Sequence, residues 1–139
     1  MYVQTVTWRG HSLLVDGAHN PPAAQQLAME RHRWSGEAQG LTWILGIQAH
    51  KQALDMLEHL LRPVDRAWIV PVPGHRSWSR SALVEAVPRW REQLKQADSA
   101  VMALEAIQAT GSWPQPMPVL AGSLYLIGDL LACGAIQAK

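Results

Sequence analysis

Short apolar runs alternate with segments of helical periodicity along most of the chain. The runs have strand length and suit strands that are covered on both faces of a sheet; they lie at residues 13–15, 41–47, 66–70 and 119–121. Residues 2–8 are rich in β-forming residues and alternate imperfectly between apolar and polar. Because Arg9-Gly10 can form a turn, we predict that 2–8 and 12–15 pair as a hairpin.

Helical patterns fill most of the intervals between these strands. We expect helices over 22–34 and 51–61, one from Ser79 or Ser81 to about 87, one from Asp98-Ser99 to about 109, and one from Gly122-Ser123 onward. In the last helix the predicted packing stripe consists of Leu124, Ile127, Gly128 and Leu131. Residues 89–97 fit either a helix or a short strand, and the pattern leaves both open.

The resulting order is a β-hairpin followed by repeated β-α units. It predicts an α/β, Rossmann-like fold with an open, mostly parallel sheet of about six strands, an antiparallel N-terminal edge strand and helices on both faces. The chain has 139 residues, of which 48% are apolar and 17% charged, so we expect one globular domain over 1–139.

Charge and cysteine content narrow the range of partners and compartments. The net charge of +1 gives no reason to expect nucleic acid or a membrane surface as a partner. No apolar run reaches about 18 residues, which argues against a transmembrane helix. The single cysteine, Cys133, excludes an intrachain disulfide and fits a reducing cytoplasm. Because Cys133 lies on an apolar helical pattern, we predict a buried, inert thiol.

Polar side chains follow four of the predicted parallel strands. These groups are Asp16 with His19 and Asn20, His50 with Lys51, His75 with Arg76, and Gly122 with Ser123. Because ligands of open α/β sheets bind at the carboxyl ends of the strands, we expect the four groups to meet at one edge of the sheet. The cationic members suit a phosphate or a carboxylate, so the edge could receive a nucleotide, an amino acid or both.

Each of these residues also has a purely structural interpretation. Asn20 and Ser123 are plausible helix N-caps, and His19 could bond a backbone carbonyl in the turn. Lys51 and Arg76, taken singly, are more often solvated surface charges. The spacing alone leaves both interpretations open.

Several common chemistries have no motif in this chain. There is no Gly-x-x-x-x-Gly-Lys-Ser/Thr, hence no P-loop, and no readable Ser-His-Asp nucleophile motif. No two histidines have metal-ligand spacing, and His11, His32 and His59 look like surface residues. We therefore predict no metal site built from this chain alone.

Two motifs resemble the signatures of one known family. Asp16-Gly17-Ala18-His19-Asn20-Pro21, after an apolar strand, is similar to the start of the C-terminal domain of folylpolyglutamate synthase/dihydrofolate synthase, ATP-dependent ligases related to the Mur ligases. Residues 121–128 resemble the Gly-Ser-Leu-Tyr segment near the end of that domain. Further matches occur between them in family order, at Ile44-Leu45-Gly46, Lys51, Met56, Leu57, Pro71, Gly74 and Arg76. The resemblance covers roughly residues 10–130.

The resemblance implies a reaction and a division of labour between domains. In the family, ATP with Mg²⁺ phosphorylates a carboxylate of dihydropteroate or folate, and the amine of L-glutamate attacks the acyl phosphate to form an amide. An N-terminal P-loop domain holds most of the ATP, the magnesium and the pteroate, and the C-terminal domain closes over it. By this resemblance Asp16, His19 and Asn20 would bind ATP, and Arg76, Ser123 and Lys51 would bind glutamate.

The chain also departs from the family pattern. His50 and Gln52 flank Lys51, where many relatives carry acidic residues, and the loop around Arg76 is locally variable. Since the P-loop is missing, we expect a Mur-ligase-type C-terminal domain without the N-terminal P-loop ATPase domain, inactive by itself. A stand-alone Rossmann-like binding or interaction module without catalysis is the alternative from a different class. A peptidoglycan Mur ligase domain is a third possibility, which the Gly-Ser-Leu-Tyr segment disfavours.

Overall fold

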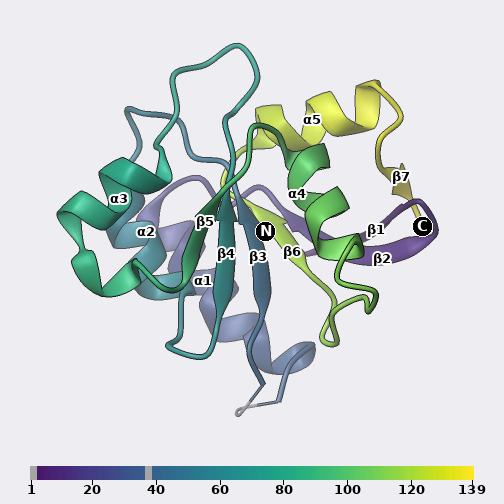
Figure 1. Cartoon of the computed structure of the whole chain (residues 1–139), viewed down its shortest axis with the longest axis horizontal. Helices are drawn as coiled ribbons and strands as arrows, with labels where there is room; N and C mark the ends of the chain where they lie inside the picture. The colour runs from purple at the N-terminus through teal and green to yellow at the C-terminus, as the bar shows by residue number, and fades with distance from the viewer. Residues whose placement is uncertain (1–2, 37–38) are drawn as a thin grey trace.

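One seven-stranded sheet organises the molecule, and its strands run in the order β5-β4-β3-β6-β2-β1-β7 (Figure 1). A computed structural model describes residues 3–36 and 39–139. The strands are β1 (Gln4–Trp8), β2 (His11–Asp16), β3 (Thr42–Leu45), β4 (Arg66–Ile69), β5 (Leu94–Gln96), β6 (Val119–Ala121) and β7 (Gln137–Ala138).

The sheet is parallel from β5 through β2 and antiparallel at the β1 end. The predicted hairpin is confirmed, because β1 pairs antiparallel with β2. Strands β2, β6, β3, β4 and β5 are parallel to their neighbours. The sheet extends one strand further than we predicted, because the two residues of β7 pair antiparallel with β1 and form the outer edge. The mostly parallel α/β fold predicted from the sequence is therefore confirmed.

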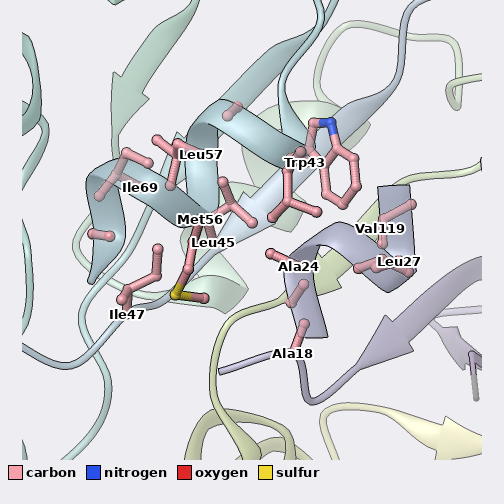
Figure 2. Close-up of a cluster of buried hydrophobic side chains, with 14 of the residues drawn as sticks. Ala18, Ala24, Leu27, Trp43, Leu45, Ile47, Met56, Leu57, Ile69 and Val119 are labelled. Atoms are coloured by element: carbon pink, nitrogen blue, oxygen red, sulfur yellow. The ribbon is translucent and has the colours of Figure 1, made fainter. Parts of the chain in front are cut away.

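Helices cover both faces of the sheet and divide the core in two. Helices α1 (Pro21–Glu30), α2 (Ala53–Leu60) and α3 (Arg80–Ala86) pack on one face, and α4 (Ala100–Gln108) and α5 (Leu124–Ala132) on the other. The strands supply both layers by alternation: Trp43 and Leu45 of β3 face the first group of helices, whereas Ile44 faces the second. Figure 2 shows part of the first layer, in which Leu27 of α1 and Met56 of α2 belong to the same buried cluster as the strand residues Trp43 and Leu45.

The undecided segment 89–97 contains two short elements. A 3₁₀ helix, η2 (Pro88–Trp90), follows α3, and β5 then adds to the edge of β4. A second 3₁₀ turn, η1 (Arg31–Arg33), ends the first helix earlier than the predicted limit at 34. The strand at β5 was ambiguous in sequence because only Leu94 of its three residues is buried.

Two predictions about the last helix and its end are wrong. The predicted stripe in α5 included Leu124 and Leu131, but these side chains are 64% and 43% exposed. The buried face contains Leu126, Ile127 and Leu130 instead. Cys133, predicted to be buried, is exposed. The helix is apolar nearly all round, so its periodicity does not identify the face that packs on the sheet.

A buried ion pair fixes the end of the sheet opposite the carboxyl ends of the parallel strands. Both η-nitrogens of Arg31 donate to the carboxylate of Asp65 at 2.6 Å, and both residues are buried. Asp65 also accepts the indole N–H of Trp43 and the backbone N–H groups of Leu41 and Arg62. This network connects the end of α1 to the starts of β3 and β4.

The chain changes sides of the sheet at β6. From β3 it leads into α2 on one face, whereas from the neighbouring β6 it leads into α5 on the other. Helices that leave adjacent parallel strands on opposite faces open a crevice between their loops, which is where ligands bind in such sheets. The topology therefore places the candidate site at the carboxyl ends of β2, β6 and β3.

Candidate functional site

The last residues of four parallel strands lie level with one another. Pairing aligns Asp16 of β2 with Ala121 of β6, Ala121 with Leu45 of β3, and Leu45 with Ile69 of β4. The four loops that carry the predicted site residues therefore start from one row, at one edge of the sheet. This arrangement agrees with the edge predicted from the sequence.

The central loops approach each other closely because two glycines allow it. A Cβ on Gly122 would lie 2.5 Å from the carbonyl oxygen of Gly46, and Gly122 has a φ of +108°. A Cβ on Gly17 would lie 2.3 Å from Cδ2 of Leu124. A Cβ at position 17 would therefore displace the side chain of Leu124 from its present position.

Asp16 is a buried carboxylate with one oxygen unpaired. Its side chain is buried, and Oδ1 accepts the N–H of Ala18 at 2.8 Å. Oδ2 is buried and has no hydrogen-bond partner among the described residues. Burial raises the pKa of Asp16, the bond from Ala18 opposes this, and the charge of Glu30 adds to the rise. An unpaired buried acceptor is free to receive a donor from a ligand.

Asp16 and His19 line a cavity of about 360 Å³ beside the start of α5. The remaining wall is largely apolar and consists of Gln4, Val15, Gly17, Leu124 and Ile127. Nδ1 of His19 lies 2.9 Å from the carbonyl oxygen of Gly17. Since a carbonyl oxygen can only accept, Nδ1 carries the proton in this contact and Nε2 remains available to a ligand.

A second cavity, of about 200 Å³, adjoins the first and shares His19 and Leu124 with it. It is lined by His19, Gln48, His50, Lys51, Gly122, Ser123, Leu124 and Tyr125. The lining includes one ammonium group and two imidazoles but no carboxylate. Its wall is also the N-terminal end of α5, which carries partial positive charge. Both features favour an anion in this cavity.

Asn20 and Ser123 act as helix caps, as the structural interpretation of the sequence suggested. The side chain of Asn20 accepts the N–H of Ala23 at the start of α1. The hydroxyl of Ser123, which is buried, accepts the N–H groups of Tyr125 and Leu126. Each cap retains donors: the amide NH₂ of Asn20 and the hydroxyl proton of Ser123. Capping therefore leaves both residues able to donate to a ligand.

Lys51 and Arg76 belong to two loops that are bonded to each other. The N–H of Ala49 donates to the carbonyl of Arg76 at 2.7 Å, and Gln48 forms an isolated bridge with Ser77. Lys51 is half-buried and lines the second cavity, whereas the exposed Arg76 lines neither cavity. Four of the six predicted residues therefore line the cavities, whereas Asn20, next to His19, and Arg76 line neither.

Sequence reasoning missed three residues of the second cavity. Gln48 is buried and lies in the loop after β3, in which only His50 and Lys51 were selected. Leu124 and Tyr125 were assigned to packing or to the motif, yet they are exposed at the site, and the ring of Tyr125 lies 4.5 Å from that of His75. The available signal was the position of all three residues just beyond the end of a parallel strand, β3 for Gln48 and β6 for Leu124 and Tyr125.

The described residues contain neither a metal-binding cluster nor a membrane-spanning helix. Within residues 3–36 and 39–139, no group of three or more His, Cys, Asp or Glu side chains could hold a metal ion. Among the helices of the described ranges, none is both long enough and apolar enough to cross a bilayer.

Comparison with solved structures finds this fold in folate ligases. Folylpolyglutamate synthase from Thermotoga maritima is 23% identical, with a TM-score of 0.70 over 94% of this chain and 30% of that one. Mycobacterium tuberculosis folylpolyglutamate synthase complexed with ADP is 19% identical, with a TM-score of 0.72 over 92% and 31%. E. coli FolC in complex with DHPP and ADP is 22% identical, with a TM-score of 0.68 over 88% and 28%. Comparison with curated protein sequences gives no match.

The fold and the two adjoining cavities define an α/β domain with its ligand crevice at a switch point of the sheet. The family model of the dihydrofolate synthetase C-terminal domain matches residues 1–133. The chain belongs to this family, as the motifs in its sequence predicted. It spans about 30% of the length of the synthases that it matches in structure.

Proposed function

We propose that this chain is the C-terminal, substrate-closing part of an ATP-dependent folate–glutamate ligase, either folylpolyglutamate or dihydrofolate synthase. The observation that carries this proposal is the pair of adjoining cavities, one with a buried unpaired carboxylate oxygen and one lined by the ammonium group of Lys51 and two imidazoles without a carboxylate. A nucleotide and an amino acid are ligands with matching groups. The synthases complexed with ADP support the nucleotide part by similarity.

The larger cavity would hold the nucleoside end of ATP. Ribose hydroxyls are donors, and Oδ2 of Asp16 is an acceptor without a partner, so a bond between them would satisfy a buried polar atom. Apolar walls at Val15, Leu124 and Ile127 suit a planar base. His19 would stand beside the nucleotide through its free Nε2, and Asn20 through its amide NH₂.

The smaller cavity would receive the carboxylates of glutamate. Lys51 supplies a full positive charge, and the hydroxyl proton of Ser123 can be donated while its oxygen caps α5. Arg76 would join only if its loop turned toward the cavity, since it lies outside the lining. In a water-excluded cleft, such donors hold a charged substrate at a defined position.

The proposed reaction joins a carboxylate to an amine in two steps. The γ-phosphoryl group of ATP passes to a carboxylate oxygen of the pteroate or folate, which yields ADP and an acyl phosphate. The amine of glutamate then attacks the acyl carbon, phosphate leaves with the bonding electrons, and the amine loses a proton as the amide forms. Residues of this chain would orient glutamate and shield the acyl phosphate from water.

The phosphate-binding loop and the magnesium ligands would come from an N-terminal P-loop domain, because this sequence contains no P-loop motif. The chain alone should therefore bind nucleotide weakly and form no amide. An exposed thiol at Cys133 suits the reducing cytoplasm, where we place the reaction.

A titration of the ¹⁵N-labelled chain with ADP and magnesium, followed by glutamate, tests the proposal. We expect ADP to shift the amides of residues 16–20 and glutamate to shift those of Lys51, Gly122 and Ser123. Asp16→Ala should abolish the nucleotide shifts, whereas Glu85→Gln, at an exposed site on α3, should not. Nucleotide shifts that survive Asp16→Ala unchanged would contradict the role of Asp16.

The stand-alone binding module is the second candidate. Leu124 and Tyr125 are exposed at the mouth of the site and favour this candidate, because exposed apolar side chains suit the binding of a partner protein. A chain that shows no shifts with either ligand at millimolar concentration would support this candidate against the ligase domain.

A further inference from the structure

One half of one sheet face, at β4 and β5, is only partly covered by helices: Trp68 of β4 packs against the layer under α4 and α5 but stays partly exposed, and Lys95 of β5 is exposed. Helices α4 and α5 bury residues of β1, β2, β3 and β6, but the core layer beneath them contains no residue of β5. In Figure 1, β3 and β4 face the viewer without a helix in front of them, and α4 lies to their right. Strands of a parallel sheet are normally covered on both faces, so this partly open half is unusual.

The open half carries two cations beside an aromatic ring. Register places Arg66 next to Thr42 and Lys95 next to Trp68. All four point away from the helices α1–α3, because they alternate with the buried residues Trp43, Ala67, Ile69 and Leu94 of the opposite layer. The ammonium of Lys95 lies 5.4 Å from the ring centre of Trp68. Sequence analysis attached no chemistry to these residues.

A cavity of about 140 Å³ lies between this surface and the end of α4. Its lining combines the four strand residues and Ala67 with Ala106, Ile107, Thr110 and Pro114. An apolar cavity of about 150 Å³ is known to accept one benzene ring, so this volume suits a single six-membered ring. The ring of Trp68 offers a stacking surface, and Ile107 and Pro114 offer aliphatic contacts.

The charges of the cavity favour an anionic group on that ring. Neither Arg66 nor Lys95 forms an ion pair among the residues that the structure describes, and no carboxylate lines the cavity. A guanidinium accepts a carboxylate in a planar, two-pronged contact, and an ammonium adds a second charge-assisted bond. The hydroxyls of Thr42 and Thr110 can donate as well.

We propose that this cavity is a binding site for a small aromatic carboxylate. The ring would stack on Trp68 beside Ile107, and the carboxylate would bind Arg66 and Lys95 at the open side. The site is separate from the strand-end cavities, with which it shares no residue, and the proposal does not rest on the ligase function.

Titration of the ¹⁵N-labelled chain with benzoate tests this site. We expect shifts of the Trp68 indole N–H and of the amides of Thr42, Lys95 and Thr110, with a dissociation constant in the millimolar range. Acetate, which lacks the ring, and benzamide, which lacks the charge, should each bind at least tenfold more weakly. The double variant Arg66→Gln/Lys95→Gln should also lose tenfold or more, whereas Arg33→Gln, at another exposed arginine, should bind as the parent does.

Three results would overturn the proposal. They are an absence of shifts at these four residues up to about 50 mM benzoate, equal binding of benzamide, and binding that the double variant leaves unchanged. The NMR spectra of the variants also show whether they fold, because the amide signals of the core layer under α1–α3 should keep the positions that they have in the parent chain.

Discussion

The buried pair of Arg31 and Asp65 offers the sharpest test of how this fold is held together. Asp65→Asn keeps the size of the side chain but replaces one carboxylate oxygen by an NH₂ group. The carboxylate accepts two bonds from Arg31 and one each from Leu41, Trp43 and Arg62. The amide of asparagine keeps only one acceptor oxygen, and its NH₂ group would face the donors that the other carboxylate oxygen now accepts. Arg31 would also keep a buried positive charge without a counter-ion.

The expected cost is about 3–5 kcal/mol, which is typical when one partner of a buried ion pair is removed. A domain of this size is stable by about 5–15 kcal/mol, so the variant should lose a large share of its stability. Urea denaturation followed by circular dichroism at pH 7 measures the loss. Glu92→Gln, at an exposed turn, serves as a control and should change the free energy of unfolding by less than about 0.5 kcal/mol.

The pH dependence gives the prediction a second, independent readout. Burial by itself raises the pKa of Asp65, but the hydrogen bonds from Arg31, Leu41, Trp43 and Arg62 outweigh it, and the pKa is lowered. A lowered pKa in the folded state means that the carboxylate stabilises the protein above its unfolded pKa of about 3.9. This stability is lost as pH falls from there through the folded value.

The parent chain should therefore lose stability between about pH 5 and pH 2 more steeply than Asp65→Asn does. A cost below about 1 kcal/mol at pH 7, or identical pH profiles of parent and variant, would refute the reasoning. The double variant Arg31→Met/Asp65→Leu should recover part of the loss, because it leaves no unpaired charge.

Three further predictions concern the candidate site. The pKa of Asp16 is raised in the folded chain, so its protonated form stabilises the fold below the unfolded pKa, and this contribution is lost as pH rises through the folded pKa. Asp16→Asn should therefore raise the urea midpoint of unfolding at pH 7 and weaken ADP binding in the NMR titration. Gly122→Ala should cost about 2 kcal/mol or more, because its Cβ meets Gly46; Gly134→Ala, with positive φ but open space, should cost about 1 kcal/mol in the same denaturation assay. Ser123→Ala should cost about 1 kcal/mol through the lost cap of α5, and Ser123→Gly less; equal losses in thermal unfolding would contradict a capping role.

The sequence predicted those residues of the candidate site that come directly after the buried strands. Asp16, His50 and Ser123 each follow a buried apolar run, and parallel strands bring such positions to one edge whatever lies between them. The choice between capping and binding could not be made from spacing, because a cap and a ligand contact use the same side-chain oxygen. The structure assigns the oxygens of Asn20 and Ser123 to caps and leaves their donors free.

The buried face of α5 and the presence of β7 depend on tertiary packing and could not be predicted from hydrophobic periodicity. Helix α5 is apolar nearly all round, so the exposed position of Leu124 depends on where α5 meets the β2–α1 turn at Gly17. Likewise β7, with two exposed residues, carries no apolar signal and exists only because β1 offers an unpaired edge.

The alternation of strands and helices, the hairpin and the parallel sheet could all be predicted from the sequence, because each follows from local hydrophobic periodicity and turn residues. The sequence also determined the family, through motifs about a hundred residues apart in the chain, at 16–21 and 121–128. The unpaired Oδ2 of Asp16 and the partial exposure of Trp68 could be seen only in the folded chain. These properties depend on contacts between distant segments, and a pattern of neighbouring residues does not record such contacts.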